Sequence, residues 1–533
     1  MFLFLLNNDF VISFYFNARN GNIAHCERTV GYSFLSWLFV FRQQGNNIMR
    51  TPAVNKQAMT VLAALVLTSC ATSEGLHTHN KMLNPDSLAA KNTLSQVTLS
   101  PANWPKGNWW ERFNDPQLDV LIRDGLASSP SLQEVNARAD QANAMVVSAR
   151  AAQLPDINMD ASITRSRVAR VDDPLLVGKT YSTLRTASLG TSYELDLWGG
   201  KKAAWQAALG NAKAAELDKQ AAALGLSANI ARAWNSLNLA WKLEKIAAAN
   251  AERLAKISAI QRQFYHGGIS PEYQYKQAMA NDKDAQTALL QAQENVTAAG
   301  IKLSTLVGKG PDYWHHLKPS ESNPAMQTTL PSSIPAELVG RRPDVVAARW
   351  RVEAAEKQIK ATKTEFYPNI NLVAEAGTRN LLGDAFVGAP SQFFNVGPTL
   401  SLPIFDGGKR RADLAGSNAE WDLAVAHYNS LLISSLGDIS TSIVNLKSLE
   451  QQIAQTEDAD KLAHSAWDDV SAQFKAGLRP WLDVLSLQDQ LLASDRSVAQ
   501  LQGDMMDQNI LLIEQLGGGL VTQSESHPAA SIN

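Results

Sequence analysis

Residues 130–132 read Pro-Ser-Leu and residues 154–157 read Leu-Pro-Asp-Ile, and the pattern returns as Pro-Asp-Val at 343–345 and Tyr-Pro-Asn-Ile at 367–370. The two copies define a repeat unit of about 210 residues, far longer than the roughly 20 to 50 residues of a solenoid repeat. The chain is therefore a tandem duplication. We expect an architecture with two pseudo-symmetric halves.

Each copy contains a long segment with the composition of a single helix. Between Lys201 and Ser270 there is no proline, and alanine, leucine, lysine and glutamine dominate; the stretch from Lys409 to Lys475 repeats this pattern. At the helical rise per residue, such a helix is roughly 100 Å long. Apolar positions step by four and three residues, which predicts a coiled-coil seam against other long helices. These positions are Leu239, Leu243, Ile246, Ile257, Ile260 and Phe264.

A glycine turn and a proline end each long segment, at Gly268 and Pro271 in the first copy and at Gly477 and Pro480 in the second. This pattern predicts long antiparallel helical hairpins. The return helices are expected at 272–306 and 481–516, and shorter helices at 132–154 and 345–366.

The residues between the short and the long helix of each copy alternate in polarity, which indicates two β-strands around a loop. The alternating positions are Ile157, Met159, Ala161 and Ile163, then Leu189, Thr191, Tyr193, Leu195 and Leu197, and in the second copy Ile370, Leu372 and Ala374, then Val396, Leu400, Leu402 and Ile404. Four strands cannot close a membrane barrel, which needs at least about eight, and lipid does not tolerate open edges. The strands must therefore close with copies from other chains.

The bulk composition excludes several classes of function. The 533 residues include 48 Lys and Arg against 51 Asp and Glu, with no clustered basic excess, so no nucleic acid is expected as a partner. Cys26 and Cys70 cannot form a disulfide framework or a metal site. His315 and His316 have no carboxylate or cysteine at ligand spacing. No catalytic constellation indicates an enzyme, and we expect no cofactor and no metal.

Residues 49–69 have the pattern of a lipoprotein signal peptide. The apolar run from Ala58 to Leu67 is too short to span a bilayer, and Leu67-Thr68-Ser69-Cys70 resembles a bacterial lipobox. This predicts lipidation of Cys70 as the first mature residue; the alternative is a plain secretory signal with a chance cysteine. Because Met49 would supply a normal start, residues 1–48 are interpreted as a gene-model extension. The rival interpretation is an N-terminal membrane anchor, but charged residues interrupt that stretch.

Several duplicated motifs together resemble a known family. They are Trp110 with Phe113, Asp115-Pro116 and Leu118; Arg341-Arg342-Pro343-Asp344 with Ala347 and Ala348; Tyr367-Pro368; residues 402–408, which read Leu-Pro-Ile-Phe-Asp-Gly-Gly; Gly477 with Leu482-Asp483-Val484-Leu485; and Leu516-Gly517. In this order they resemble an outer membrane factor of the TolC and OprM type, in the NodT-like lipoprotein branch attached to resistance-nodulation-division efflux pumps.

The resemblance implies a mainly α protein with membrane β-strands. Three chains with four strands each would form an outer membrane β-barrel, continued by a long periplasmic α-helical barrel. The implied partners are two further copies, outer membrane lipid, a periplasmic membrane fusion adaptor protein and an inner membrane efflux transporter. Adaptor contact is expected at the hairpin tips, at Gly267, Gly268, Ile269, Gly477 and Leu478.

The resemblance also implies a pore gate at the start of the second return helix. Leu482 and Asp483 match two variants of the family's constriction, whereas Ser486 stands where both often have aspartate. The alternative for Asp483 is a solvated carboxylate in the first helical turn, which the helix dipole favours.

The sequence with its resemblance therefore predicts a passive conduit in the outer membrane, lipid-anchored and extending into the periplasm, that exports small molecules such as drugs. The alternative is the outer membrane component of a type I protein secretion system. A periplasmic adaptor would need one hairpin between lipoyl-like modules, and this chain has two hairpins. The expected organisation is an extension at 1–48, signal peptide at 49–69, N-terminal belt segment at 70–129, first repeat at 130–310, inter-repeat belt segment at 311–342, second repeat at 343–519 and flexible tail at 520–533.

Overall fold

The structure is a computed structural model that describes residues 73–88, 108–167, 181–320, 341–380 and 388–518, with four short strands outside these ranges. Two compact units divide the chain at Thr68 and Ser69. In the first unit the structure describes the antiparallel strands β1 (Leu5–Leu6) and β2 (Asp9–Phe10). Several predicted features lie outside the described residues. They are Cys70, the rest of residues 1–48, both strand loops, most of the inter-repeat segment and the tail.

The larger unit contains two copies of one element order. The first copy is α5 (Pro130–Ala151), β4 (Asp156–Ser166), β5 (Ser182–Leu195), α6 (Gly200–His266) and α7 (Glu272–Leu306). The second copy is α9 (Pro343–Thr364), β7 (Asn369–Asn380), β8 (Gln392–Ser401), α10 (Lys409–Lys475) and α11 (Trp481–Gln515). Both long helices have 67 residues and both return helices have 35. The predicted hairpins are confirmed, with element ends shifted by at most a few residues.

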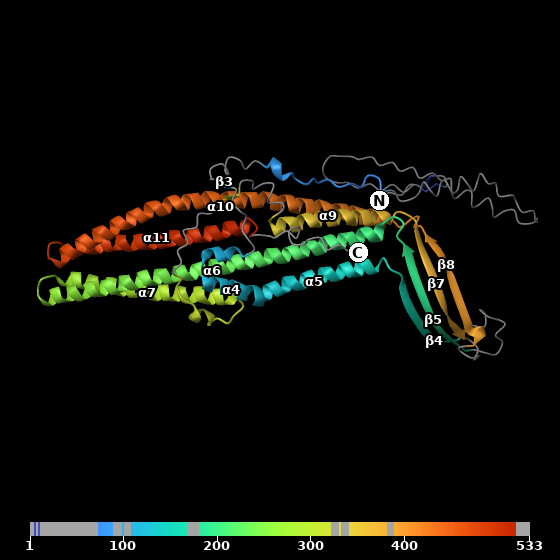
Figure 1. The fold of residues 1–533 in the computed structure, drawn as a ribbon, viewed down its shortest axis with the longest axis horizontal. Coiled ribbons are helices and arrows are strands. Elements are labelled where there is room, and N and C mark those ends of the chain that lie inside the picture. The colour runs from blue at the N-terminus through green and yellow to red at the C-terminus, as the bar shows by residue number, and fades with distance from the viewer. Residues whose placement is uncertain are drawn as a thin grey trace, which may run out of the picture. The chain divides into compact units, whose positions relative to one another are not determined.

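The helices lie along one another, with the strands at one end and both hairpin tips at the other (Figure 1). α5 and α7 follow each other along α6, and α9 and α11 follow each other along α10. Across the repeats, α6 packs on α9 and α11. A Cβ added to Gly210 would lie 3.0 Å from the Ala354 Cβ, so small residues allow α6 and α9 to approach closely.

The buried face of α6 differs from the predicted seam. Of the six seam positions only Ile257 is buried, and the remaining five are half-buried. α6 contacts α5, α7, α9 and α11, so it buries a wider surface than one coiled-coil partner would require. Much of that surface is alanine, and Leu239 fits beside Gly503 of α11, where an added Cβ would lie 2.9 Å from it.

An N-terminal wedge packs on the first half. It consists of the 3-10 helix η2 (Trp109–Phe113) and α4 (Pro116–Ser128). Asp115 is buried, and its carboxylate accepts hydrogen bonds from the Leu118 backbone N–H at 3.3 Å and from the Trp234 indole at 2.8 Å. One carboxylate thus caps α4 and fixes it to α6.

Two segments expected at the belt meet in a short parallel pair, β3 (Leu99–Ser100) with β6 (Leu330–Pro331). β3 precedes the wedge, and β6 lies in the segment that joins the two repeats. Of the described helices, none has a stretch long and apolar enough to cross a bilayer.

Candidate pore gate, hairpin tips and membrane sheet

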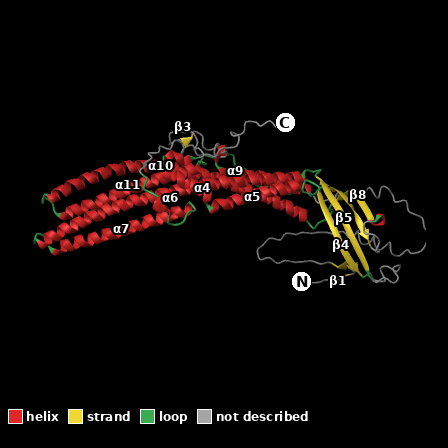
Figure 2. Cartoon of the chain, turned by 60° about the horizontal axis from the view of Figure 1, so that its bottom comes forward, coloured by secondary structure: helices red, strands yellow, loops and turns green. Residues whose placement is uncertain are grey.

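The four-stranded sheet has order β4-β5-β7-β8 and is antiparallel throughout, as Figure 2 shows with the strands in yellow. Side chains of paired residues point to the same face. Ile157, Thr191, Ala374 and Val396 are successive partners on one face, where Ile157 is 70% and Val396 78% exposed. This face is mainly apolar and is open within the chain.

The opposite face of the sheet is mainly polar. A row on it reads Asn158, Gly190, Glu375 and Asn395. The described sheet pairs β4 and β8 on one side each, so each has a free outer edge. A sheet with one apolar face, one polar face and two free edges has the pattern of a membrane-barrel segment.

Aromatic residues mark the junction between the sheet and the helices. The Trp198 indole donates a hydrogen bond of 2.8 Å to the Pro368 carbonyl, and it stacks on Tyr367 with ring centroids 4.8 Å apart. The junction therefore links the end of the first strand pair to the start of the second. Tryptophan and tyrosine are enriched at such membrane–water boundaries.

Both hairpin tips close in the same way. Gly268 and Gly477 have φ values of +70° and +76°, a left-handed conformation that favours glycine. The backbone N–H of Ile269 donates to the Phe264 carbonyl at 2.8 Å, and that of Leu478 donates to the Gln473 carbonyl at 2.9 Å. Ile269 and Leu478 are each 75% exposed. Each tip therefore presents one bare apolar side chain.

The second return helix is anchored at its first turn by Trp481 and Val484. Both are buried in a cluster with Ala251, Leu254 and Ile257 of α6. One turn further on, the Gln488 side chain donates a hydrogen bond of 2.7 Å to the side-chain oxygen of Asn250 within the buried interface. The start of α11 therefore rests on the first hairpin.

The residues expected at the gate lie on different sides of this helix. Leu482 is 57% exposed and Ser486, one turn later, is also exposed. Asp483 is half-buried, and its carboxylate accepts a hydrogen bond of 3.3 Å from Arg479, which also donates to Gln473. Leu482 and Ser486 share one face, while Asp483 is turned about 100° away.

The face of Leu482 and Ser486 carries a further acidic residue, Asp489, which is exposed. Spacings of three and four residues place side chains on one helix face. The sequence-based prediction of the gate did not include Asp489. Its spacing of seven residues from Leu482, which is two helical turns, is the signal that places it on the same face.

Residues 74–83 form an extended strap along α10. The Asp422 carboxylate accepts from the backbone N–H groups of Asn80 at 2.8 Å and His79 at 2.9 Å. Two helical turns further along α10, the Asn429 side chain forms two hydrogen bonds to the strap backbone. It donates to the Lys81 carbonyl and accepts from the Leu83 N–H. The hydrogen bonds from Asn80 and His79 lower the pKa of Asp422 below its ordinary value.

A family model described as "Outer membrane efflux protein" matches the chain twice, over residues 121–309 and 334–518. The chain belongs to the outer membrane efflux protein family. Membership confirms the predicted family: the chain is an efflux component of the outer membrane, its helices extend into the periplasm, and it is not an enzyme. The double match also fits the tandem duplication.

Named efflux proteins are among the relatives of this family member. The fusaric acid resistance protein FusA of Burkholderia cepacia is 34% identical over 379 residues, which cover 70% of this chain and 71% of FusA. The multidrug resistance outer membrane protein MdtP of Escherichia coli K12 is 26% identical over 482 residues, which cover 87% of this chain and 98% of MdtP.

Solved structures of outer membrane proteins share the fold. The outer membrane protein VceC of Vibrio cholerae has a TM-score of 0.71 and 31% identity, covering 78% of this chain and all of its own. The CmeC outer membrane channel of Campylobacter jejuni has a TM-score of 0.78 at 21% identity. The match covers 84% of this chain and 97% of the CmeC chain. The predicted fold class is confirmed by these neighbours.

Proposed function

We propose that three copies of this chain close into one channel, a passive conduit through which small molecules cross the outer membrane. The observation that carries the proposal is the sheet with one apolar face, one polar face and free edges on β4 and β8. Joining β8 of one copy to β4 of the next satisfies those edges, and three four-stranded sheets give an even-numbered barrel.

Cross-linking across the proposed strand joint tests this assembly. Because closure into a barrel staggers neighbouring strands, one cysteine on the polar face of β4 is combined in turn with one on the polar face of β8, and only the pairs in register should cross-link. The β4 positions are Asp156, Asn158, Asp160, Ser162 and Thr164, the β8 positions are Phe393, Asn395, Gly397, Thr399 and Ser401, and the background is Cys26→Ser with Cys70→Ser. We expect covalent dimers and trimers in outer membrane preparations and a trimer in native mass spectrometry. A matched pair on the inner strands, Gly190 and Glu375, should give cross-links within the chain only. A folded, stable monomer that inserts in the membrane would refute the trimer.

We propose that the hairpin tips bind a periplasmic membrane fusion adaptor, which links the conduit to an inner membrane efflux transporter. Exposed Ile269 and Leu478 support this, because each repeat presents an apolar residue at the same position. The adaptor-contact residues proposed are Gly267, Gly268, Ile269, Gly477 and Leu478. Substituting Ile269 and Leu478 by Asp should abolish adaptor capture while leaving trimers intact.

The cargo is proposed to be small molecules, because the relatives are named for resistance to fusaric acid and for multidrug resistance. The alternative is the outer membrane part of a type I protein secretion system. A deletion strain distinguishes the two: increased susceptibility to toxic compounds with an unchanged set of secreted proteins supports efflux, and the reverse supports secretion.

We propose that Cys70 carries a lipid anchor. The strap supports this, because Arg411, near the sheet end of α10, donates to the Glu74 carbonyl while Asn429 holds Leu83 further along α10. The strap therefore runs from Leu83 to Glu74 toward the sheet end of α10. Mass spectrometry of the mature N-terminus tests the anchor. An unlipidated mature chain would contradict it, and Cys70→Ser should weaken anchoring without preventing barrel insertion.

A further inference from the structure

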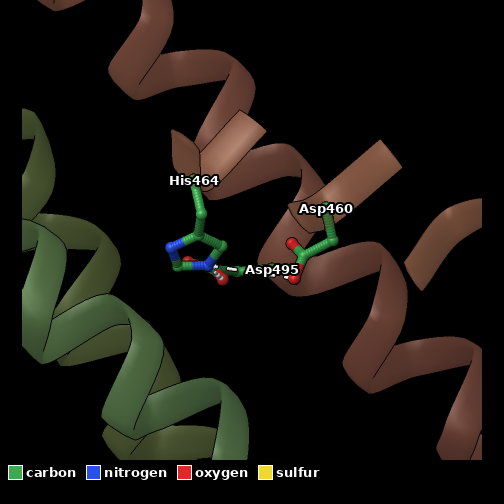
Figure 3. Close-up of side chains that lie close together, drawn as sticks. All are labelled: Asp460, His464 and Asp495. Atoms are coloured by element: carbon green, nitrogen blue, oxygen red, sulfur yellow. Dashed lines mark hydrogen bonds and ion pairs between the residues drawn. The ribbon is translucent and has the colours of Figure 1, made fainter. Parts of the chain in front are cut away.

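A histidine and two aspartates from both helices of the second hairpin meet about halfway along α11 (Figure 3). Asp460 and His464 are one turn apart on α10, and Asp495 reaches them from α11. The His464 Nε2 lies 2.9 Å from the Asp495 Oδ1 and 3.8 Å from the Asp460 Oδ2. Each of the three residues offers one potential ligand atom, and these three atoms lie within 4.8 Å of one another.

This donor set has the chemistry and spacing of a transition-metal site. Imidazole nitrogen and carboxylate oxygen are both ligands of Zn²⁺, at about 2.0 to 2.2 Å, so neighbouring ligands of a tetrahedral ion lie about 3.3 Å apart. The two observed separations of 2.9 and 3.8 Å bracket that value. A pair of ligands four residues apart on one helix is also the spacing used in known helical zinc motifs.

One carboxylate oxygen of the cluster is left unsatisfied by the side chains around it. The Asp460 Oδ1 is buried and has no hydrogen-bond partner among the described residues. The Asp460 and Asp495 side chains are 22% and 20% exposed, whereas that of His464 is 51% exposed and leaves an entry path. Two sheltered carboxylates repel each other, and one imidazolium can neutralise only one of them. A divalent cation would neutralise both.

Two charged groups of α10 next to the cluster are engaged elsewhere. Lys461 ion-pairs with Asp458 at 3.0 Å on the exposed side of α10. Glu457 accepts a hydrogen bond of 3.1 Å from Gln502, which in turn accepts one from Lys242 of α6 at 2.6 Å. These contacts leave Asp460, His464 and Asp495 as a separate group.

We propose that Asp460, His464 and Asp495 bind one divalent cation of the zinc class, with water completing the coordination. The three residues supply two carboxylates and a neutral imidazole, and the bound ion ties α10 to α11. Counting from the tip glycines Gly268 and Gly477, the equivalent first-copy residues are Ala251, Ala255 and Gln286, which cannot form such a site. The site therefore belongs to the second hairpin alone.

Cobalt binding to the full-length trimer tests the site. The protein is purified in detergent with an affinity tag that contains no histidine, stripped with a chelator, and titrated with Co²⁺ by visible absorption, with Zn²⁺ as competitor. We expect one high-affinity ion per chain, displaced by Zn²⁺ and not by excess Mg²⁺. His464→Ala and Asp495→Asn should each weaken binding by at least about 10-fold. His427→Ala, which alters another exposed histidine of α10, should leave binding unchanged.

Thermal unfolding distinguishes a metal site from a simple ion pair. If the cluster binds metal, Zn²⁺ raises the Tm of the wild type and of His427→Ala but not that of His464→Ala. If it is only an ion pair, His464→Ala lowers the Tm and Zn²⁺ changes none of the three. Absence of cobalt bands in the wild type, or unchanged affinity in a trimeric His464→Ala, would overturn the proposal. Should His464→Ala not assemble, Asp460→Asn is measured in its place by the same criteria.

Discussion

The two hairpins of this chain have the same backbone but different chemistry between their helices. α6–α7 and α10–α11 match in length, in the left-handed glycine at the tip and in the exposed residue that follows it. Near its tip the first hairpin packs with alanines and with Tyr265 stacked on Tyr275 at 5.7 Å. Further from its tip, the second hairpin joins its helices through His464 and Asp495, where the first has Ala255 and Gln286. Duplication thus preserved geometry through a few turn residues, while the contacts between the helices diverged.

The largest effect is expected where the second hairpin rests on the first. Trp481→Ala should destabilise the protein by about 3 to 5 kcal/mol, because it leaves a cavity in the cluster that holds the start of α11. Its exposed neighbour provides the control, since Leu482→Ala should change stability by less than about 0.5 kcal/mol. Thermal unfolding of purified trimers measures both. Equal effects would mean that the hairpins do not depend on this contact.

A smaller loss is expected from the buried hydrogen bond between the hairpins. Gln488→Ala leaves the Asn250 side-chain oxygen without its partner and should cost about 1 to 3 kcal/mol. Asn250→Leu combined with Gln488→Leu removes both polar groups and should cost less than the sum of the two single changes. A double-mutant cycle measures the coupling. Strict additivity would show that the two side chains act independently.

If the gate lies at the start of α11, substitutions in the second hairpin should change channel conductance more than the equivalent substitutions in the first. Leu482→Ala should raise conductance in planar bilayers, and Asp483→Ala should reduce cation selectivity or block by divalent cations. The equivalent first-copy changes, Tyr273→Ala and Gln274→Ala, should act more weakly. Asp489→Asn adds a test of the exposed face, since this residue lines up with Leu482 and Ser486. If conductance stays constant in every second-copy variant with trimers intact, the gate lies elsewhere.

The smallest expected effect is a dependence on pH. It distinguishes the two long helices, because the strap lies on α10. The pKa of Asp422 is lowered below its ordinary value of 3.8 by the N–H groups of Asn80 and His79. Its contribution is therefore complete above pH 3.8 and is lost as the pH falls through the lower folded pKa. The protection factors of the residue 79 and 80 amides, which correct for the intrinsic pH dependence of exchange, should be the same at pH 7 and pH 5. Asp422→Asn should lower these protection factors at both pH values, and equal protection in that variant would contradict the role of Asp422.

Local signals in the sequence were sufficient for the elements but not for their contacts. Gly268, Pro271, Gly477 and Pro480 determine where helices end and begin through their own backbone conformations, so the hairpins could be predicted. The pairing of His464 with Asp495 depends on how α10 is aligned against α11, across 31 residues of sequence. The orientation of Asp483 likewise depends on Trp481 and Val484 being buried against α6.

Charge is unevenly distributed along the polar face of the sheet. Asp156 stands at the helix end, where Glu194 is ion-paired with Lys201 at 2.9 Å; Asp160 and Glu375 stand in the middle, and Arg379 near the outer loops. With this face toward the lumen, the electrostatic potential would be negative where solutes enter from the periplasm and positive near the exit. A positively charged solute would then be concentrated at the entrance, whereas the positive outer rim would be a barrier to its passage in both directions.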